Sequence, residues 1–456
     1  MDKKNSSSMR VNIVKTGING EGIAFYKEQP LFVAGAIEGE CVEVAVTHVY
    51  KTYRIAKLVK IVKKSKDRRS VLCEHNQSCG ACTLMHIRYE KQLEIKESIL
   101  HQALKKYSSV EQRCVQKICP SESELGYRNS IKLPFHMKGK QLQVGMYARD
   151  SHRFASLPTC IVHERELDKV KGKVVSVVNK HHMVAYSNGQ KDGLRYLVIR
   201  GFEDKFQLCI VSGVCTFEKA FIDDIMQIQG VVSLYQSINP TKKTVAIFGK
   251  QTQWLAGNKK LNFTFMDFKL SLLPRSFFQL NTKQAMNLYR YVDDFIGEDD
   301  QVVEAYSGIG VMSLLAARKG ASVVGIENVK DAVHNARSNA KRNGYKDINF
   351  EVGDAALMVR KFLQTNIIDV LIVDPPRSGM DDAMIDTLMQ SDIKKIIYVS
   401  CNPSTLAKNL HRLSKCYCVE RIAPVDMFPN TSHVETCVLL SHKNSKHLHR
   451  PYTPGN

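Results

Sequence analysis

The spacing of apolar residues changes character along the chain, and each change predicts a different kind of structure. Residues 10–65 contain short alternating stretches interrupted by glycines, a pattern typical of the short strands of an OB-like β-barrel. Residues 90–108 carry apolar side chains at helical spacing, which predicts a helix. Residues 126–265 look strand-rich, with no strong helical pattern before 219–229. We therefore expect a barrel followed by a mixed α+β region.

From about residue 266 the pattern becomes a regular alternation of apolar runs and helical segments. The apolar runs lie at 302–306, 322–326, 370–373 and 396–399. Parallel strands that are covered on both faces read as continuous apolar runs, so this alternation predicts a mostly parallel, doubly wound sheet. The C-terminal part of the chain is therefore expected to have a Rossmann-like α/β fold.

The length of 456 residues is too great for one ordinary core. At roughly 150 residues per domain, we expect two or three domains. The changes of pattern place a β-barrel at 1–68, a central α+β domain at 69–265, an α/β domain at 266–442 and a polar, disordered tail at 443–456. A helix near 90–120 is expected to pack on the α/β domain.

The composition adds a prediction about partners. Hydrophobic residues make up 44% and charged residues 24% of the chain, which is ordinary for a globular protein, but the formal net charge is +20. Such an excess speeds association with polyanions and opposes self-association, so we expect a monomer that binds nucleic acid. The basic stretch 57–69 is either a solvated face or a surface that follows a phosphate backbone.

The apolar pattern also bears on localisation. The sequence has no run of about 18 apolar residues, so we expect no membrane span. Residues 1–9 are polar and lack the apolar middle of a signal peptide. These two features predict a cytoplasmic protein.

A glycine-containing loop follows the first predicted strand of the α/β domain. Gly308 lets the backbone approach a ligand closely, and Glu327, about 20 positions on, suits hydrogen bonds to ribose hydroxyls. The third glycine of a dinucleotide loop is replaced by Ser313, which favours a nucleoside ligand without phosphates, such as S-adenosylmethionine. Asp354, after the third strand, either contacts the adenine or belongs to a simple turn.

Three further residues at strand ends carry candidate chemistry. Asp374 precedes two prolines that fix the backbone at the sheet edge. Cys401 lies just before a predicted helix start, where the helix N-terminus stabilises a thiolate, although most free cysteines are simply buried small residues. Glu435 stands at the head of an apolar strand, which is an unusual position for a glutamate unless it pairs with a neighbouring Arg or Lys.

Taken together, these segments resemble the RNA 5-methyluridine methyltransferase family over nearly the whole chain. The matching motifs, in the family's order, are Phe277-Phe278-Gln279-Leu280-Asn281, Tyr306-Ser307-Gly308-x-Gly310, Asp374-Pro375-Pro376-Arg377-x-Gly379, Ser400-Cys401-Asn402-Pro403 and His433-Val434-Glu435. The resemblance implies a class I methyltransferase domain whose contacts to S-adenosylmethionine are Gln279, Tyr306, Glu327 and Asp374. It also implies that Cys401 is the nucleophile and Glu435 the general base.

Four of the 13 cysteines form a separate group, Cys73, Cys79, Cys82 and Cys160. Their spacing suits either a tetrahedral zinc site or a [4Fe–4S] cluster. In the ribosomal-RNA branch of the family the matching cysteines hold an iron–sulfur cluster, so the resemblance favours a structural cluster in the central domain. The N-terminal barrel resembles a TRAM domain, an RNA-binding module of the same branch, and points to 23S rRNA as the substrate.

Other functions remain open at this point. The substrate could instead be a tRNA, or the chain a non-catalytic RNA-binding assembly factor. An amino-group methyltransferase would share Asp374-Pro375-Pro376, but it normally has an aromatic residue where this chain has Arg377, and it has no use for Cys401. The family motif Tyr127-Arg128-Asn129 either contacts RNA or holds the fold.

Overall fold

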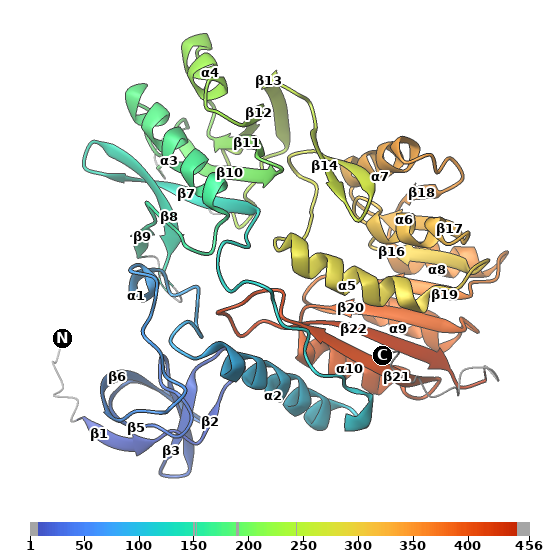
Figure 1. Ribbon diagram of the computed structural model, residues 1–456, viewed down its shortest axis with the longest axis horizontal. Helices are drawn as coiled ribbons and strands as arrows, with labels where there is room; N and C mark the ends of the chain where they lie inside the picture. The colour runs from blue at the N-terminus through green and yellow to red at the C-terminus, as the bar shows by residue number, and fades with distance from the viewer. Residues whose placement is uncertain (1–7, 149–150, 152, 188–190, 243, 445–456) are drawn as a thin grey trace.

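The computed structural model describes residues 8–148, 151, 153–187, 191–242 and 244–444. It shows a small barrel, a central sheet with two covering helices and a larger α/β domain, arranged around a common centre (Figure 1). Within these residues no helix combines the length and the hydropathy needed to cross a membrane. The tail predicted to be disordered lies outside the described residues, apart from 443 and 444.

The N-terminal barrel is a six-stranded sheet with the order β1-β5-β6-β4-β3-β2. Its strands are β1 (Met9–Asn12), β2 (Lys15–Thr16), β3 (Gly22–Tyr26), β4 (Gln29–Val33), β5 (Cys41–Val49) and β6 (Arg54–Lys63). Alternate residues of β5, including Val42 and Val44, point into a core that also contains Leu31 and Val33. The alternation seen in the sequence is thus the inward and outward alternation of a half-buried sheet.

The segment after the barrel contains α1 (Asn76–Cys79), η1 (Gln112–Cys114) and the long helix α2 (Tyr89–Tyr107). In its middle turns α2 packs on the barrel through a cluster that joins Ile95 and Ile99 to Ile37 and Leu84. Near its end, Leu100 and its neighbours pack into the core of the α/β domain, where α2 contacts α10 (Pro403–Leu413). The helix therefore fixes the barrel against the α/β domain.

The central domain is a seven-stranded sheet with the order β13-β12-β11-β10-β7-β8-β9. Its elements are β7 (Ser130–Lys138), β8 (Gln141–Tyr147), β9 (Phe154–Ser156), α3 (Arg165–Lys180), β10 (Leu194–Phe202), β11 (Lys205–Ser212), α4 (Lys219–Met226), β12 (Val231–Ile238) and β13 (Gln251–Gly257). A two-stranded hairpin, β14 (Leu261–Phe265) and β15 (Phe268–Leu272), leads from this sheet to the α/β domain.

Helix α3 contradicts the expectation that the region from residue 126 contains no strong helix before residue 219. Its valines are β-branched and favour strands, which makes the segment look extended in sequence. Leu167, Val170, Val174 and Val178 nevertheless recur at helical spacing and are all buried in the core of the central domain. Burial of this apolar stripe against the sheet outweighs the local propensity.

The α/β domain is a seven-stranded sheet with the order β18-β17-β16-β19-β20-β22-β21. Its elements are α5 (Thr282–Phe295), β16 (Gln301–Ala305), α6 (Val311–Arg318), β17 (Ser322–Glu327), α7 (Lys330–Arg342), β18 (Asn349–Val352), α8 (Ala355–Leu363), β19 (Val370–Val373), α9 (Asp382–Met389), β20 (Lys395–Ser400), α10, β21 (Tyr417–Val425) and β22 (Glu435–His442). Pairing is parallel from β18 to β20 and antiparallel from β20 through β22 to β21. The prediction of a mostly parallel, doubly wound sheet is confirmed.

Candidate active site

The candidate residues converge because parallel strands end at the same edge of the sheet. Asp374 follows β19 and Cys401 follows β20, and these two strands are hydrogen-bonded neighbours. The antiparallel strand β22 begins at the same edge with Glu435. Ser400 pairs with Thr436, so Cys401 and Glu435, one position further towards the edge on each strand, lie opposite one another.

The cofactor candidates surround two adjoining hollows at this edge. The first, of about 50 Å³, is lined by Tyr289, Tyr306, Gly308 and Asp374, among others. The second, of about 210 Å³, is lined by Tyr306 together with Glu327, Asp354 and neighbouring residues. Tyr306 lines both hollows, and its backbone has a φ of 64°, a left-handed conformation that is costly for a bulky residue. This unusual backbone turns the side chain towards the ligand side of the sheet edge.

Two of the residues predicted to contact the cofactor, Glu327 and Asp354, also form hydrogen bonds within the protein. Glu327 accepts hydrogen bonds from the backbone N–H of Gly308 at 3.1 Å and of Val329 at 2.9 Å. Asp354 is the N-cap of α8, because its Oδ1 accepts from the N–H of Leu357 at 3.0 Å. The carboxylate of Asp354 therefore has a structural role, and it also lines the second hollow.

Gln279 lies beside the site, before α5, and is not among the residues that line either hollow. Its side chain is buried beside Tyr289, which lines the first hollow. Its backbone carbonyl accepts a hydrogen bond of 2.9 Å from the side chain of Asn129, which also donates to Thr282. Tyr127, two residues earlier, donates its hydroxyl proton to the carbonyl of Pro429 at 3.1 Å. The motif Tyr127-Arg128-Asn129 thus connects the cofactor segment to the loop before β22.

A separate cavity of about 190 Å³ opens beside Cys401. Helix α10 begins here, with Pro403 in its first turn and the side chain of Asn402 accepting from the N–H of Ser404. Helix α10 begins where the sequence predicted a helix start. Other effects nevertheless outweigh the expected stabilisation of the Cys401 thiolate by this helix. Burial, and then the adjacent Glu435 carboxylate, raise the pKa of Cys401 to about 11, while the guanidinium of Arg377 opposes that shift.

Glu435 is a buried carboxyl group with an altered acidity. Burial, reinforced by the nearby Asp374, raises the pKa of Glu435 to about 8, and the positive charges of Arg377 and Lys96 act in the opposite direction. Burial also raises the pKa of Asp374 to about 7. Carboxyl groups with a pKa near the working pH are suited to take up and release protons.

A buried ion pair near Glu435 was not predicted from the sequence. Lys96 on α2 and Asp426 after β21 are both fully buried and contact each other directly. Tyr89 donates to the second oxygen of Asp426 at 2.7 Å, and Lys96 also donates to the carbonyl of Phe428 at 3.0 Å. These bonds fix the loop that leads into β22 and so the position of Glu435.

The same loop is held a second time at Asn430, a fully buried residue with a φ of 66°. Its N–H donates to the side chain of Gln92 at 2.9 Å, and its Oδ1 accepts from Arg69 at 2.8 Å. Its carbonyl accepts from the N–H of Leu84 at 2.9 Å. The loop before Glu435 is therefore tied both to α2 and to the segment that follows the barrel.

Replacing Lys96 with methionine is expected to destabilise the fold and to shift the pH dependence of the reaction. The change leaves the Asp426 carboxylate buried without its cation, which costs about 3–5 kcal/mol. It also removes a positive charge that lowers the pKa of Glu435, so that this pKa rises further. Denaturant unfolding and the pH–rate profile measure the two effects.

Lys91 on the same helix provides the control, because it pairs with Glu94 near the surface. Lys91→Met should cost less than about 1 kcal/mol and leave the pH profile in place. Equal unfolding free energies for the Lys91 and Lys96 variants would contradict the importance of the buried pair.

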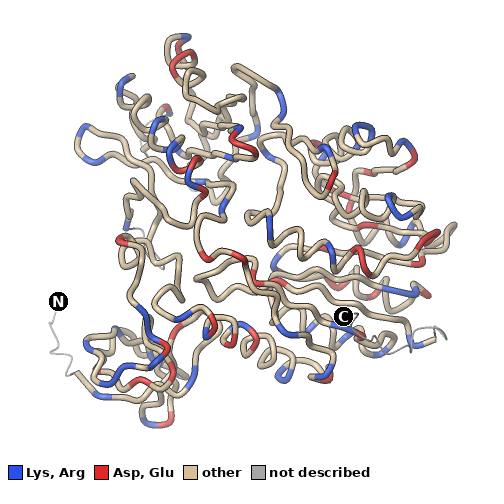
Figure 2. Tube along the Cα trace, viewed as in Figure 1, with Lys and Arg blue, Asp and Glu red and all other residues tan. Residues whose placement is uncertain are grey.

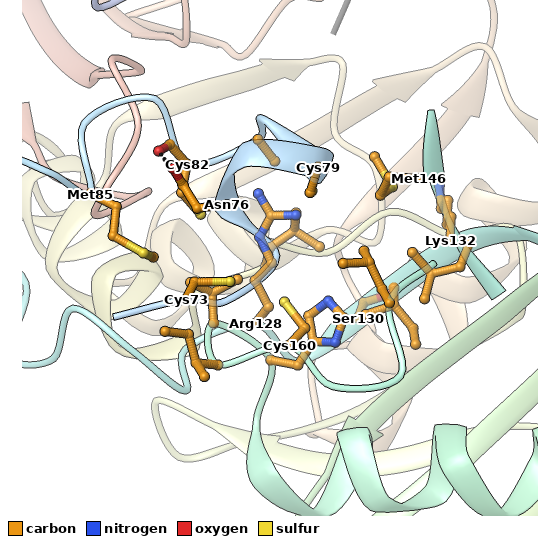
Figure 3. Close-up of a pocket in the computed structure, with 18 of the residues that line it drawn as sticks. Cys73, Asn76, Cys79, Cys82, Met85, Arg128, Ser130, Lys132, Met146 and Cys160 are labelled. Carbon is orange, nitrogen blue, oxygen red and sulfur yellow. Dashed lines mark hydrogen bonds between the residues drawn. The ribbon is translucent and has the colours of Figure 1, made fainter. Parts of the chain in front are cut away.

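The four grouped cysteines line one cavity of about 270 Å³ between the barrel segment and the central sheet. Figure 3 shows Cys73, Cys79, Cys82 and Cys160 around it, with the side chain of Arg128 among them. In the described part of the chain, no three His, Cys, Asp or Glu side chains lie close enough together to hold a metal ion. The structure therefore places the four thiols around a shared cavity without gathering them into a formed metal site.

Comparisons with known proteins agree with this architecture. Residues 216–443 match the family model of tRNA (uracil-5-)-methyltransferases, and residues 2–59 match that of the TRAM domain. An uncharacterized RNA methyltransferase of Halalkalibacterium halodurans is 36% identical over 450 residues, covering 96% of this chain and 97% of its own. Another, from Streptococcus agalactiae, is 34% identical over 443 residues, covering 95% and 98%.

A solved structure is also similar to this chain in its fold. The Pyrococcus abyssi tRNA (uracil-54, C5)-methyltransferase, in complex with S-adenosyl-L-homocysteine, matches with a TM-score of 0.77 and 27% identity, covering 95% of this chain and 99% of that one. The fold is that of a class I, S-adenosylmethionine-dependent methyltransferase with an N-terminal TRAM domain. The chain belongs to the RNA uracil-5-methyltransferase family, as its motifs indicated.

Proposed function

We propose that this enzyme methylates C5 of a uracil in RNA by transient covalent catalysis through Cys401. The observation that carries the proposal is the placement of Cys401 opposite Glu435, at the sheet edge that also bears the cofactor hollows. The contacts to S-adenosylmethionine are assigned to Gln279, Tyr306, Gly308, Glu327, Asp354 and Asp374.

The reaction order follows from the chemistry of uracil, whose C5 is a poor nucleophile. The Cys401 thiolate adds to C6, and the resulting enolate attacks the methyl group through C5, which releases S-adenosylhomocysteine. Glu435 then removes the C5 proton, and the electrons of the C5–H bond re-form the C5–C6 double bond as the bond between C6 and sulfur breaks, which releases the Cys401 thiolate. Arg377 favours the thiolate that the first step needs, since its charge lowers the pKa of Cys401.

RNA reaches this site along a basic surface. Figure 2 shows several Lys and Arg positions on the barrel. The exposed lysines of β6 and of the segment after it are Lys57, Lys60, Lys63, Lys64 and Lys66. Arg68 and Arg69 do not belong to this surface, because they form ion pairs with Glu40 and Glu124. The lysines are available for phosphate contacts, as expected of an RNA-binding module.

We propose 23S rRNA as the substrate and a cytoplasmic monomer as the working form. The ribosomal assignment rests on the family resemblance, in which the TRAM domain and the four grouped cysteines point to the rRNA branch, and the charge of +20 opposes self-association. The likeness to an enzyme described as acting on uracil-54 of tRNA favours a tRNA as the second candidate.

Mass spectrometry of the RNA from cells that lack the gene separates these two substrates. Loss of 5-methyluridine from 23S rRNA, with tRNA unchanged, is the expected result. Loss from tRNA alone would replace the ribosomal assignment with the second candidate. Unchanged 5-methyluridine in both RNAs would contradict the proposed function.

The cysteines Cys73, Cys79, Cys82 and Cys160 are proposed as the ligands of a [4Fe–4S] cluster. Four thiols around one cavity match its donor set, and the buried Nε of Arg128 in their midst has no hydrogen-bond partner among the described residues, which suits a neighbouring anionic group. The cluster would crosslink the central domain to the segment after the barrel.

Anaerobic purification is expected to give a protein with visible iron–sulfur absorbance and about four iron atoms per chain. Cys79→Ala should abolish both signals, whereas Cys215→Ala should keep them, because Cys215 is not among the residues that line the cavity. Zinc at about one atom per chain without visible absorbance would show the tetrahedral alternative instead.

A further inference from the structure

The cavity beside Cys401 is built by three parts of the chain. The α/β domain supplies Arg377, Cys401 and the residues next to them, and α2 supplies Ile99. The third contribution comes from the barrel, whose turn between β2 and β3 places Ile18 and Asn19 on the cavity wall. A module recognised for binding RNA therefore also forms part of the catalytic pocket.

This turn is held firmly in its own right. The N–H of Gly17 donates to the carbonyl of Glu21 at 2.7 Å, and the N–H of Gly20 donates to the carbonyl of Gly17 at 3.0 Å. Gly20 has a φ of 85°, which a glycine adopts without strain. The turn thus has a defined shape, with Ile18 near its tip.

The turn also packs against the segment that follows the barrel, which is in turn bonded to the loop before β22. A Cβ added at Gly20 would lie 2.8 Å from Cδ2 of Leu84 and 3.0 Å from Oγ1 of Thr83, so the backbone of the turn lies directly against these two side chains. Leu84 is itself bonded to the carbonyl of Asn430, in the loop that continues to the Ser432–Val434 wall of the cavity. A short series of contacts therefore fixes the distance between Ile18 and the catalytic residues.

The exposure of Ile18 is otherwise unexplained by the fold. Its side chain is 61% exposed although it is large and apolar, and it belongs to none of the described core clusters. Val59 on β6 is similarly exposed, at 56%, but does not line the cavity. Exposed apolar residues are common on any surface, so what distinguishes Ile18 is its position beside Cys401.

A uridine has to leave its stack to bring C6 to Cys401, and this exposes an apolar base face on the neighbouring nucleotide. Apolar side chains of nucleic-acid-binding proteins pack against such faces and stabilise the unstacked state. We propose that Ile18 packs against the nucleotide adjacent to the target uridine and so acts as a positioning residue of the barrel. This inference rests on the proposed function and adds a role for the TRAM domain in selecting the target.

The test compares Ile18→Ala, Ile18→Leu and Val59→Ala by transfer of radiolabelled methyl groups. The RNA used is rRNA and tRNA purified from cells that lack the gene. Ile18→Ala is expected to lower kcat/KM for RNA about tenfold or more. The alanine side chain buries much less apolar area against the bound nucleotide than the isoleucine side chain does. Ile18→Leu should recover most of the activity, and Val59→Ala should match the unmodified enzyme.

Two further readouts distinguish positioning from a general defect. The affinity for S-adenosylmethionine and the melting temperature of Ile18→Ala should equal those of Val59→Ala, since neither side chain lines the cofactor hollows or the barrel core. Equal kcat/KM values for these two variants would overturn the inference while leaving the proposed function intact. Failure of the unmodified enzyme to methylate either RNA would instead overturn the proposed function.

Discussion

Methyl transfer to RNA is expected to stop when Cys401 is replaced by alanine, while S-adenosylmethionine still binds with unchanged affinity. The loss is complete because no other group can activate C5 of uracil once the addition to C6 is impossible. Binding is preserved because Cys401 lines a separate cavity from the two cofactor hollows. Radiolabelled methyl incorporation into RNA measures the first effect, and isothermal titration calorimetry measures the second.

The matched control for this variant is Cys418→Ala, which changes an exposed cysteine on β21. It should retain full activity, so that a general sensitivity to cysteine replacement is excluded. Turnover by the Cys401 variant above the background rate would contradict the assignment of the nucleophile. Loss of cofactor affinity in that variant would instead indicate a disturbed fold.

The α/β domain was predictable because its local pattern and its tertiary environment agree. Every residue of Val370–Val373 is buried, so a run of apolar residues alone identifies β19 as a strand covered on both faces. Once parallel strands are assigned, their carboxyl ends must meet at one edge, which brings the loops of Asp374 and Cys401 together. Helix α3 was missed because its valines suggest a strand, and only packing on the central sheet decides for a helix.

The support behind the catalytic residues was not predictable, because it depends on distances that the sequence does not contain. Lys96 and Asp426 are 330 positions apart, and each looks like an ordinary surface charge until the fold buries both. The pKa of Cys401 could not be predicted from the sequence either. Its place before a helix was visible in the sequence, whereas the opposing effects of burial and of Glu435 arise only from the assembled sheet edge.

Replacing Glu435 with glutamine is expected to trap the enzyme as a covalent adduct with methylated RNA. The amide cannot remove the C5 proton, so the bond between Cys401 and C6 persists after the methyl group has been transferred. Turnover should fall by about 10²–10⁴-fold, the usual contribution of a general base. Incubation with S-adenosylmethionine and labelled RNA should then give a slowly migrating protein–RNA band on a denaturing gel.

The pH dependence of the unmodified enzyme tests the same base independently. The pKa of Glu435 is raised to about 8, and only the ionised carboxylate accepts a proton. Where proton removal limits the rate, turnover should therefore fall about tenfold for each pH unit below 8. Above pH 8 the ionisation of Glu435 should cause no further increase in turnover.

The double variant Cys401→Ala with Glu435→Gln should form no adduct, because the trapped bond is made by the Cys401 sulfur. A normal rate and no adduct in the Glu435 variant would assign proton removal to another group. Asp374 is then a candidate, because its pKa is raised to about 7 and its charge acts on Glu435.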